Sequence, residues 1–476
     1  MKKYWQIQND FLSLFQRDNS KENYFHCIDG IRSIASLLIT SLHIIGIFTA
    51  LLLPYPDIQW QRYLHSNAFA LLNLMSFALE IFFMLSSFLL TYKLISVWNK
   101  NSLNNDNFIL KEYPLLIIRR ILRFWPGFLL VSLILLIFGE PFYPGSGFFF
   151  ELFRNLNLWL FFQNYINIDY WYATFAPLWS ISLDMQIHIV LPLILYLFYL
   201  NQKRISILKS LYLLLILSII FIIIQFNPQT MSILSLSYQY SSIRILSPPY
   251  LNQWFERNYN LTKFSSIPES QSLKLFMSNI YLPLECRFGS FIIGSILAIK
   301  LLQTYEKSSL NTKTKFQIFK KYFFIGLIFF HLSTLIQPSQ IPPNPPDFLI
   351  KIFLGISRQL FTIGQAFLLF TGLCPSSHPY HSKWIKSFLS FHIWIPLSKL
   401  SYLVYLIHLR LAFELIFHGP LTFLKSYSIT YATLISLPIV ILLSQVISII
   451  WYLFIEKPIE RFINYQFTKI QSTKNI

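Results

Sequence analysis

Apolar runs of about 20 residues, the length that crosses a bilayer as an α-helix, recur along the whole of this 476-residue chain. Only 12% of the residues are charged and 54% are hydrophobic, which leaves too little charge for the surface of a soluble protein of this size. The sequence therefore predicts an all-α integral membrane protein with about ten transmembrane helices. These are expected at 31–53, 69–95, 115–138, 177–200, 207–226, 284–303, 321–337, 348–372, 397–418 and 428–455.

The basic residues predict which side of the membrane each connection faces, because Lys and Arg are enriched in cytoplasmic connections. With a cytoplasmic N-terminus, 27 of the 38 Lys and Arg residues fall on the cytoplasmic side, in alternate connections. We therefore expect both termini to be cytoplasmic, with a polar tail over 1–26, a transmembrane domain over 27–460 and a second tail over 461–476. The segment 148–163 is too short and too polar to span, and is expected to lie at the membrane surface.

The net charge of +18 would suit a nucleic-acid partner, but the basic residues lie between apolar runs and form no basic domain. We therefore expect membrane lipids as partners and no nucleic acid. The three cysteines are too few and too far apart for a disulfide framework. The sequence has no G-x-S-x-G motif, no P-loop, no dinucleotide fingerprint and no Cys/His zinc spacing, so it predicts neither a soluble-type serine hydrolase nor a metal site.

The first apolar run contains two residues that are costly in a membrane, Arg32 and His43. They are eleven residues apart and so share a helix face, about 16 Å apart along the axis. A guanidinium at the cytoplasmic mouth suits a phosphate or carboxylate. A histidine deeper in the membrane loses its charge through desolvation and can then act as a general base. Alternatively, Arg32 anchors the helix at the headgroups and His43 bonds a neighbouring helix, and the spacing alone does not separate these interpretations.

Two further predicted helices carry charged residues. Arg120 and Arg123 are three residues apart at the inner mouth of the third helix, with Arg119 beside them. Together they could hold the phosphates of a nucleotide-type cofactor, although anchoring at the cytoplasmic surface explains any one of them. On the fourth helix, Asp184 and His188 are four residues apart and share a face. Asp184 could orient a base, hold an acceptor hydroxyl or simply lie at the interface.

The remaining candidates are polar residues on other predicted helices. Glu80 in the second run is costly unless it is paired. The hydroxyl of Ser86 follows it, and such hydroxyls more often bond the helix backbone than react. Asp29 opens the first run. Tyr405 and His408, near the C-terminal end, are three residues apart and can face one cavity.

These residues occur in a set of motifs that resembles the acyltransferase 3 family of membrane acyltransferases. The family pattern of an Arg, ten residues and a His falls on Arg32 and His43, and its R-x-x-R falls on Arg120 and Arg123. The matches run in order from about residue 27 to residue 460, and they are CIDGIRSIASLLITSLH, EIFFMLSSFLL, RRILRF, PLWSISLDMQIHIVLPL, PLSKLSYLVYLIH and IEKP.

One motif points to a branch of this family, and one position departs from its pattern. The W-S-x-x-x-D-M-Q run from Trp179 to Gln186 resembles the animal branch, the nose-resistant-to-fluoxetine proteins. The family usually has a glycine where this chain has Ser87. Because that glycine permits close approach of helices, the packing there is expected to differ.

The resemblance implies a membrane O-acyltransferase with acyl-CoA as its donor substrate. The phosphates of the donor would meet Arg32, Arg120 and Arg123 at the cytoplasmic mouth. His43 would act as a general base on a hydroxyl of a lipid or glycan acceptor, or relay the acyl group across the membrane, with Asp184 as a second catalytic residue. The alternatives are a lipid or small-molecule transporter that uses the same cavity without acyl transfer, and a non-catalytic scaffold or receptor. The plasma membrane or the endoplasmic reticulum is the expected location.

Overall fold

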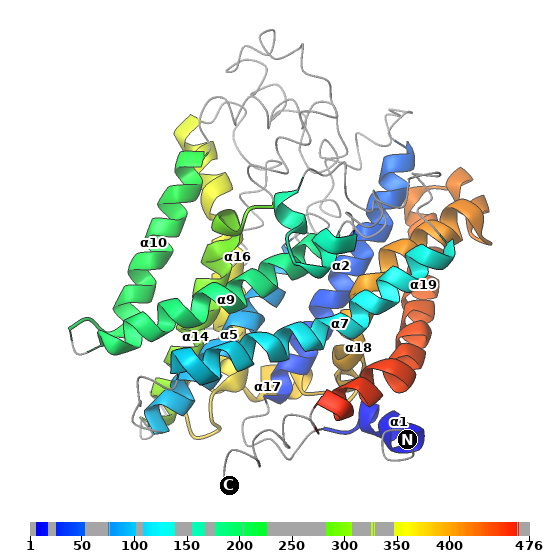
Figure 1. Ribbon diagram of the computed structural model, residues 1–476. Coiled ribbons are helices and arrows are strands. Elements are labelled where there is room, and N and C mark those ends of the chain that lie inside the picture. The colour runs from blue at the N-terminus through cyan, green and yellow to red at the C-terminus, as the bar shows by residue number, and fades with distance from the viewer. Residues whose placement is uncertain are drawn as a thin grey trace.

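The computed structural model describes residues 6–17, 25–52, 75, 77–100, 108–138, 155–166, 177–202, 204–225, 282–306, 325–326, 328, 347–463 and 465. Every regular element of this part of the chain is a helix, and no strand occurs in it. Figure 1 shows long helices packed in a bundle. The long helices are α2 (His26–Leu52), α5 (Ala78–Lys100), α7 (Tyr113–Phe138), α9 (Trp179–Leu200), α10 (Ile207–Gln225), α14 (Leu284–Glu306), α16 (Asp347–Leu373), α18 (Trp394–Phe413) and α19 (Ile429–Trp451).

Nine of the ten predicted runs coincide with these helices, and the run at 321–337 lies almost wholly outside the described residues. The all-helical fold is therefore confirmed for the described residues. Within the described residues, seven stretches are long and apolar enough to cross a membrane, so the count of ten remains a prediction. They are His26–Phe48, Ala78–Asn99, Phe108–Ile137, Trp179–Leu200, Ile207–Gln225, Trp394–His418 and Thr430–Ile463.

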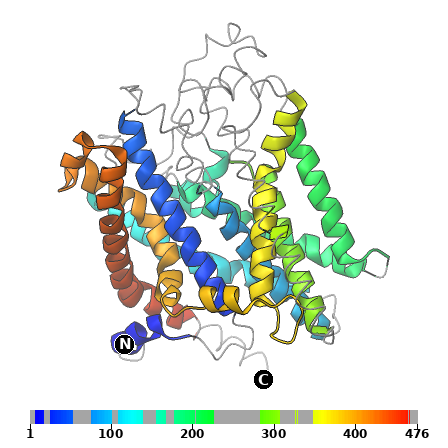
Figure 2. The ribbon, with the colours of Figure 1, turned by 180° about the vertical axis from the view of Figure 1, so that it is seen from behind.

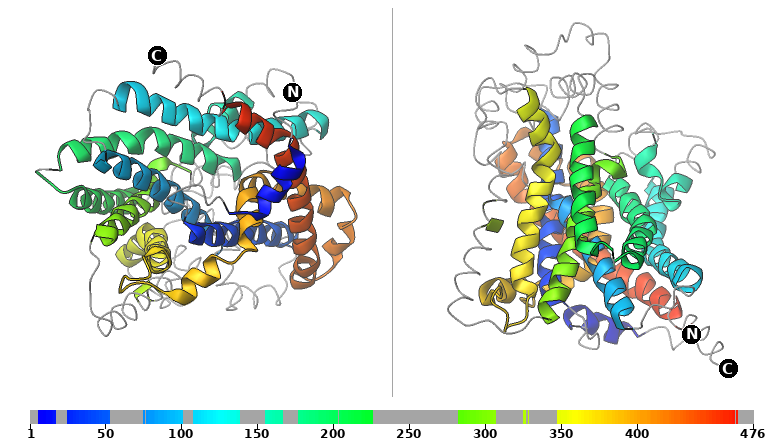
Figure 3. Two further views of the ribbon diagram at one scale, coloured as in Figure 1. Left: turned by 90° about the horizontal axis from the view of Figure 1, so that it is seen from below. Right: turned by 90° about the vertical axis from the view of Figure 1, so that its left-hand side faces the viewer.

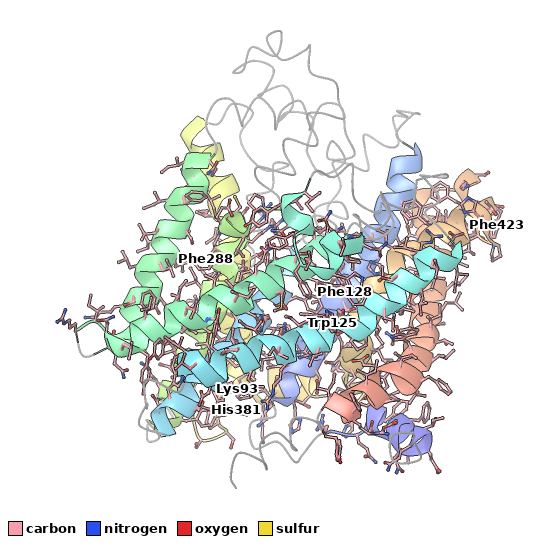
Figure 4. The ribbon with its side chains drawn as sticks, in the orientation of Figure 1. Lys93, Trp125, Phe128, Phe288, His381 and Phe423 are labelled. Atoms are coloured by element: carbon pink, nitrogen blue, oxygen red, sulfur yellow. The ribbon has the colours of Figure 1, made fainter. Side chains whose placement is uncertain are left out.

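The outer surface of the bundle is apolar, as expected of helices that face lipid. On α10, for example, Leu213, Ile216 and Ile224 are all more than half exposed, at 59%, 54% and 67%. Figure 4 shows side chains along the whole length of α7, where Trp125 and Phe128 lie near the middle of the helix. These observations support an integral membrane protein.

The helices α5 and α14 lie side by side because Gly294 of α14 has no side chain. A Cβ atom at this position would overlap the carbonyl oxygen of Met84 and the hydroxyl of Ser87. One turn further along α5, Thr91 donates a hydrogen bond of 2.9 Å to Ser295. Ser87 stands where the motif of the family has a glycine. The close approach is therefore retained because the glycine is on the facing helix.

The two ends of the described chain lie at the same end of the bundle. Asp10 of the short helix α1 (Ile7–Phe15) forms an ion pair with Arg461, which follows α19. Lys399 of α18 donates hydrogen bonds of 2.5 and 2.6 Å to the carbonyl oxygens of Ser13 and Gln16. Figure 2 shows α1 at the same lower end as α17 (Lys383–Leu389). That both termini are cytoplasmic remains a prediction.

The helices α7 and α9 run obliquely, side by side, across one face of the bundle (Figures 1 and 3). Their contact brings charged residues from the two helices together, while α5 lies behind them and supplies a third side chain. On the other side, α2 packs along α18. These two contacts place the candidate residues described below.

Candidate functional site

His43 of α2 bonds His408 of α18, and we call this pair the histidine dyad. Nδ1 of His43 lies 2.7 Å from Nε2 of His408, and the two rings are nearly parallel, at an angle of 9°. Nδ1 of His408 lies 3.0 Å from the carbonyl oxygen of Val404. For Nε2 of His43, the described part of the chain provides no hydrogen-bond partner. Nδ1 of His43, the candidate base, is therefore hydrogen-bonded, while its Nε2 has no such partner in the described part of the chain.

Tyr405 extends this polar group from α18 to α9. Its ring centre is 5.9 Å from that of His408, as their spacing of three residues predicts. Its hydroxyl lies 2.7 Å from the hydroxyl of Ser180 and donates a hydrogen bond of 2.7 Å to the carbonyl oxygen of Pro177. Ser180 stands one helical turn before Asp184 on α9. Tyr405 thus connects the histidine dyad to the helix that carries the candidate acid.

Asp184 is held by side chains from two other helices, and none of its described contacts is with the histidine dyad. Its carboxylate accepts hydrogen bonds from Arg120 of α7 and Ser86 of α5. Arg120 also donates a hydrogen bond of 3.2 Å to Ser86, and His188 donates one of 2.7 Å to the backbone carbonyl of Asp184. An ionised carboxylate in a membrane needs such partners. The described contacts of Asp184 are therefore with Arg120, Ser86 and His188, and its role as a second catalytic residue remains a prediction.

The arginines that the sequence assigned to a phosphate site lie near one another. Arg123 is one turn after Arg120 and is exposed. It lies close enough to Arg120 and Arg32 for their charges to repel, and close enough to Glu456 for attraction. We call Arg32, Arg120 and Arg123 the arginine cluster. An exposed guanidinium beside two others attracts an anion and can bind two of its oxygens at once.

Glu80 and Asp29 lie in other surroundings. Glu80 is fully buried on α5 and forms an ion pair with Arg287 of α14, which is 3% exposed. The guanidinium carbon of Arg287 also lies 5.3 Å from the ring centre of Trp179. Asp29 is buried in the first turn of α2, and Ser33 donates a hydrogen bond of 2.8 Å to its backbone carbonyl. The contacts of Glu80 are those of a residue that joins two helices.

Sequence reasoning missed two residues of this region. Arg287 lies in the predicted run 284–303, and an arginine in an apolar run needs a partner, which could have linked it to Glu80. Glu456 ends the π-helical turn η11 (Tyr452–Glu456), and one of its carboxylate oxygens is buried without a hydrogen bond within the described residues. The IEKP motif located Glu456 at the end of the last helix but gave no sign that it faces Arg123.

The comparisons with known proteins agree with the motifs. A family model described as an acyltransferase domain, that of the acyltransferase 3 family, matches residues 25–453. The matched region includes the histidine dyad and the arginine cluster. Comparisons with curated proteins and with solved structures gave no match. Because the family model covers most of the 476 residues, the chain belongs to the acyltransferase 3 family.

Proposed function

We propose that this protein is a membrane O-acyltransferase that transfers an acyl group from cytoplasmic acyl-CoA to a hydroxyl of a lipid or carbohydrate acceptor. The observation that carries the proposal is the arrangement of α2, which contributes Arg32 to the arginine cluster and His43 to the histidine dyad. The family supplies acyl transfer as the class of reaction. The cluster and the dyad support a phosphorylated donor and a base.

The separation of the two groups suits a phosphopantetheine thioester. Arg32 and His43 are eleven residues apart, which is about 16 Å along the helix axis. The arm of CoA between its sulfur and its pyrophosphate has about a dozen bonds, comparable to four extended residues, or roughly 14 Å. A donor whose phosphates bind the arginine cluster therefore has the reach to bring its thioester carbon near His43.

The proposed reaction uses the open nitrogen of His43. Nε2 takes the proton of the acceptor hydroxyl while the oxygen of that hydroxyl attacks the thioester carbonyl carbon. The carbon–sulfur bond then breaks, and the CoA thiolate leaves and takes the proton from the imidazolium. The base is thereby regenerated. Asp184 acts in this scheme by holding Arg120, which is one of the groups that would bind the donor phosphates.

Two finer assignments belong to this proposal. The motif from Trp179 to Gln186 supports a place in the animal nose-resistant-to-fluoxetine branch. The plasma membrane or the endoplasmic reticulum is the proposed location. A transporter of lipids or small molecules that uses the same residues without acyl transfer is the alternative that the following experiment separates.

The test uses purified protein in detergent with labelled acetyl-CoA and longer acyl-CoAs. Release of CoA is measured with and without extracts of membrane lipids and glycans, for the wild type, His43→Ala and His418→Ala. His418 is the control because its side chain is 62% exposed and it lies beyond the end of α18. We expect release that requires an acceptor, is lost in His43→Ala and persists in His418→Ala. No release from any donor would reject the proposal in favour of the transporter. Equal release from His43→Ala would reject His43 as the base.

A second measurement tests the donor site. Arg123→Gln should raise the KM for acyl-CoA by about tenfold or more, because a hydrogen bond to a charged group contributes about 1.5–3 kcal/mol. The same variant should leave the KM unchanged for an acyl thioester of N-acetylcysteamine, which has the reactive end of the donor and no phosphate. Equal effects on both donors would mean that Arg123 does not meet the phosphates.

A further inference from the structure

The histidine dyad contains an imidazole that the proposed reaction does not use. His408 is fully buried, at 0% exposure, whereas His43 is partly exposed. Only His43 can therefore meet a substrate. His408 nevertheless makes the described hydrogen bond to the ring of His43, so its effect on the reaction must act through His43.

The contacts of His408 determine where the protons of the dyad lie when both rings are neutral. A carbonyl oxygen only accepts hydrogen bonds, so Nδ1 of His408 carries the proton that it shares with Val404. Nε2 of neutral His408 is then a bare acceptor. The contact of 2.7 Å therefore requires a proton on Nδ1 of His43, which leaves the lone pair of His43 on Nε2.

We propose that His408 is a positioning residue that sets the tautomer of His43, so that Nε2 faces the acceptor hydroxyl as the base. This inference rests on the proposed acyl transfer. When Nε2 takes the proton of the acceptor, Nδ1–H keeps its hydrogen bond to Nε2 of His408, which stabilises the imidazolium. The proton stays on His43, because a protonated His408 would place a positive charge on a fully buried ring. The other tautomer of His43 would have a hydrogen on Nε2 and no base there.

The orientation of His408 is itself fixed. The hydrogen bond to Val404, one turn earlier on α18, sets the rotation of its ring. Tyr405 packs beside it and is tied to α9 through Ser180 and Pro177. His408 therefore offers its acceptor in one direction, as a group that orients a base must.

The first test compares two substitutions of His408 in the purified protein. His408→Leu keeps an apolar side chain of similar size and removes the acceptor, while His408→Gln places an amide near the position of Nε2. We expect kcat to fall about 10²-fold in His408→Leu, the low end of what general-base catalysis contributes. The KM for acyl-CoA should not change, because the arginine cluster is intact. His408→Gln should recover most of kcat. Wild-type kcat in His408→Leu, or equal losses in both variants, would overturn the inference.

A second readout does not require activity. In protein labelled with ¹⁵N-histidine, the signals that disappear in His43→Ala belong to His43. We expect a protonated Nδ1 and an unprotonated Nε2 in the wild type, and loss of this preference in His408→Leu. A protonated Nε2 in the wild type would overturn the inference. If the protein transfers no acyl group, the proposed function fails while this spectrum still reports the tautomer, so the two failures are distinguishable.

Discussion

The buried ion pair between Glu80 and Arg287 predicts a large loss of stability when one partner is removed. Both residues are almost inaccessible, at 0% and 3% exposure, and they join α5 to α14. Glu80→Leu would leave the charge of Arg287 in the interior without its carboxylate. Breaking a buried pair in this way costs about 3–5 kcal/mol. The contact of Arg287 with the ring of Trp179 persists in the variant, so we expect a value near the lower limit, about 3 kcal/mol.

The quantity to measure is the free energy of unfolding in detergent, obtained from a denaturant titration. The matched control is Glu460→Gln, which breaks the more exposed pair with Lys457 and should cost less than about 1 kcal/mol. The double variant Glu80→Leu/Arg287→Met should be more stable than Glu80→Leu, because no unpaired charge remains. If Glu80→Leu costs no more than the control, the pair does not hold the helices together. A loss of acyl transfer in Glu80→Leu with unchanged stability would indicate that Glu80 takes part in the reaction.

Two further predictions use the same unfolding measurement. Gly294→Ala should cost about 1–3 kcal/mol, because its methyl group meets the backbone of α5. The control is Gly46→Ala, whose Cβ would have no neighbour within 4 Å, and equal effects of the two would refute the close contact. His381 donates a hydrogen bond of 2.8 Å to the carbonyl of Cys374, and burial lowers its pKa from the ordinary 6.5. As the pH falls, the unfolded chain therefore protonates at His381 before the folded chain does. The free energy of unfolding should decrease as the pH falls below 6.5. His381→Gln should remove that part of the pH dependence, whereas the exposed His392→Gln should not, and an unchanged slope in His381→Gln would contradict the assignment.

The existence of the helices could be predicted because it depends on local sequence. A helix in a membrane satisfies its own backbone hydrogen bonds, so an apolar run of sufficient length is enough to predict it. Nine predicted runs accordingly coincide with helices of the described chain. The number of helices that span the membrane remains a prediction, because the predicted run at 321–337 lies almost wholly outside the described residues.

The partners of the polar residues could not be predicted in the same way, because they depend on how the helices rotate and cross. His43 and His408 were both singled out, yet 365 residues separate them and no spacing rule joins them. Asp184 was expected to orient a base or hold an acceptor. The packing of α7 beside α9 brings its carboxylate to Arg120, a partner that no spacing rule predicts. The cost of an unpaired charge predicted that Glu80 has a partner, but only the packing of α5 on α14 identifies it.

The attachment of α1 has a consequence for how the protein is made. Asp10 is synthesised 451 residues before its partner Arg461. The ion pair between α1 and the segment after α19 therefore cannot form until α19 has been made. A chain that stops before α19 would hold α1 only through α18, where Lys399 donates hydrogen bonds to Ser13 and Gln16. The contact of Asp10 with Arg461 thus completes the attachment of α1 late in the synthesis of the chain.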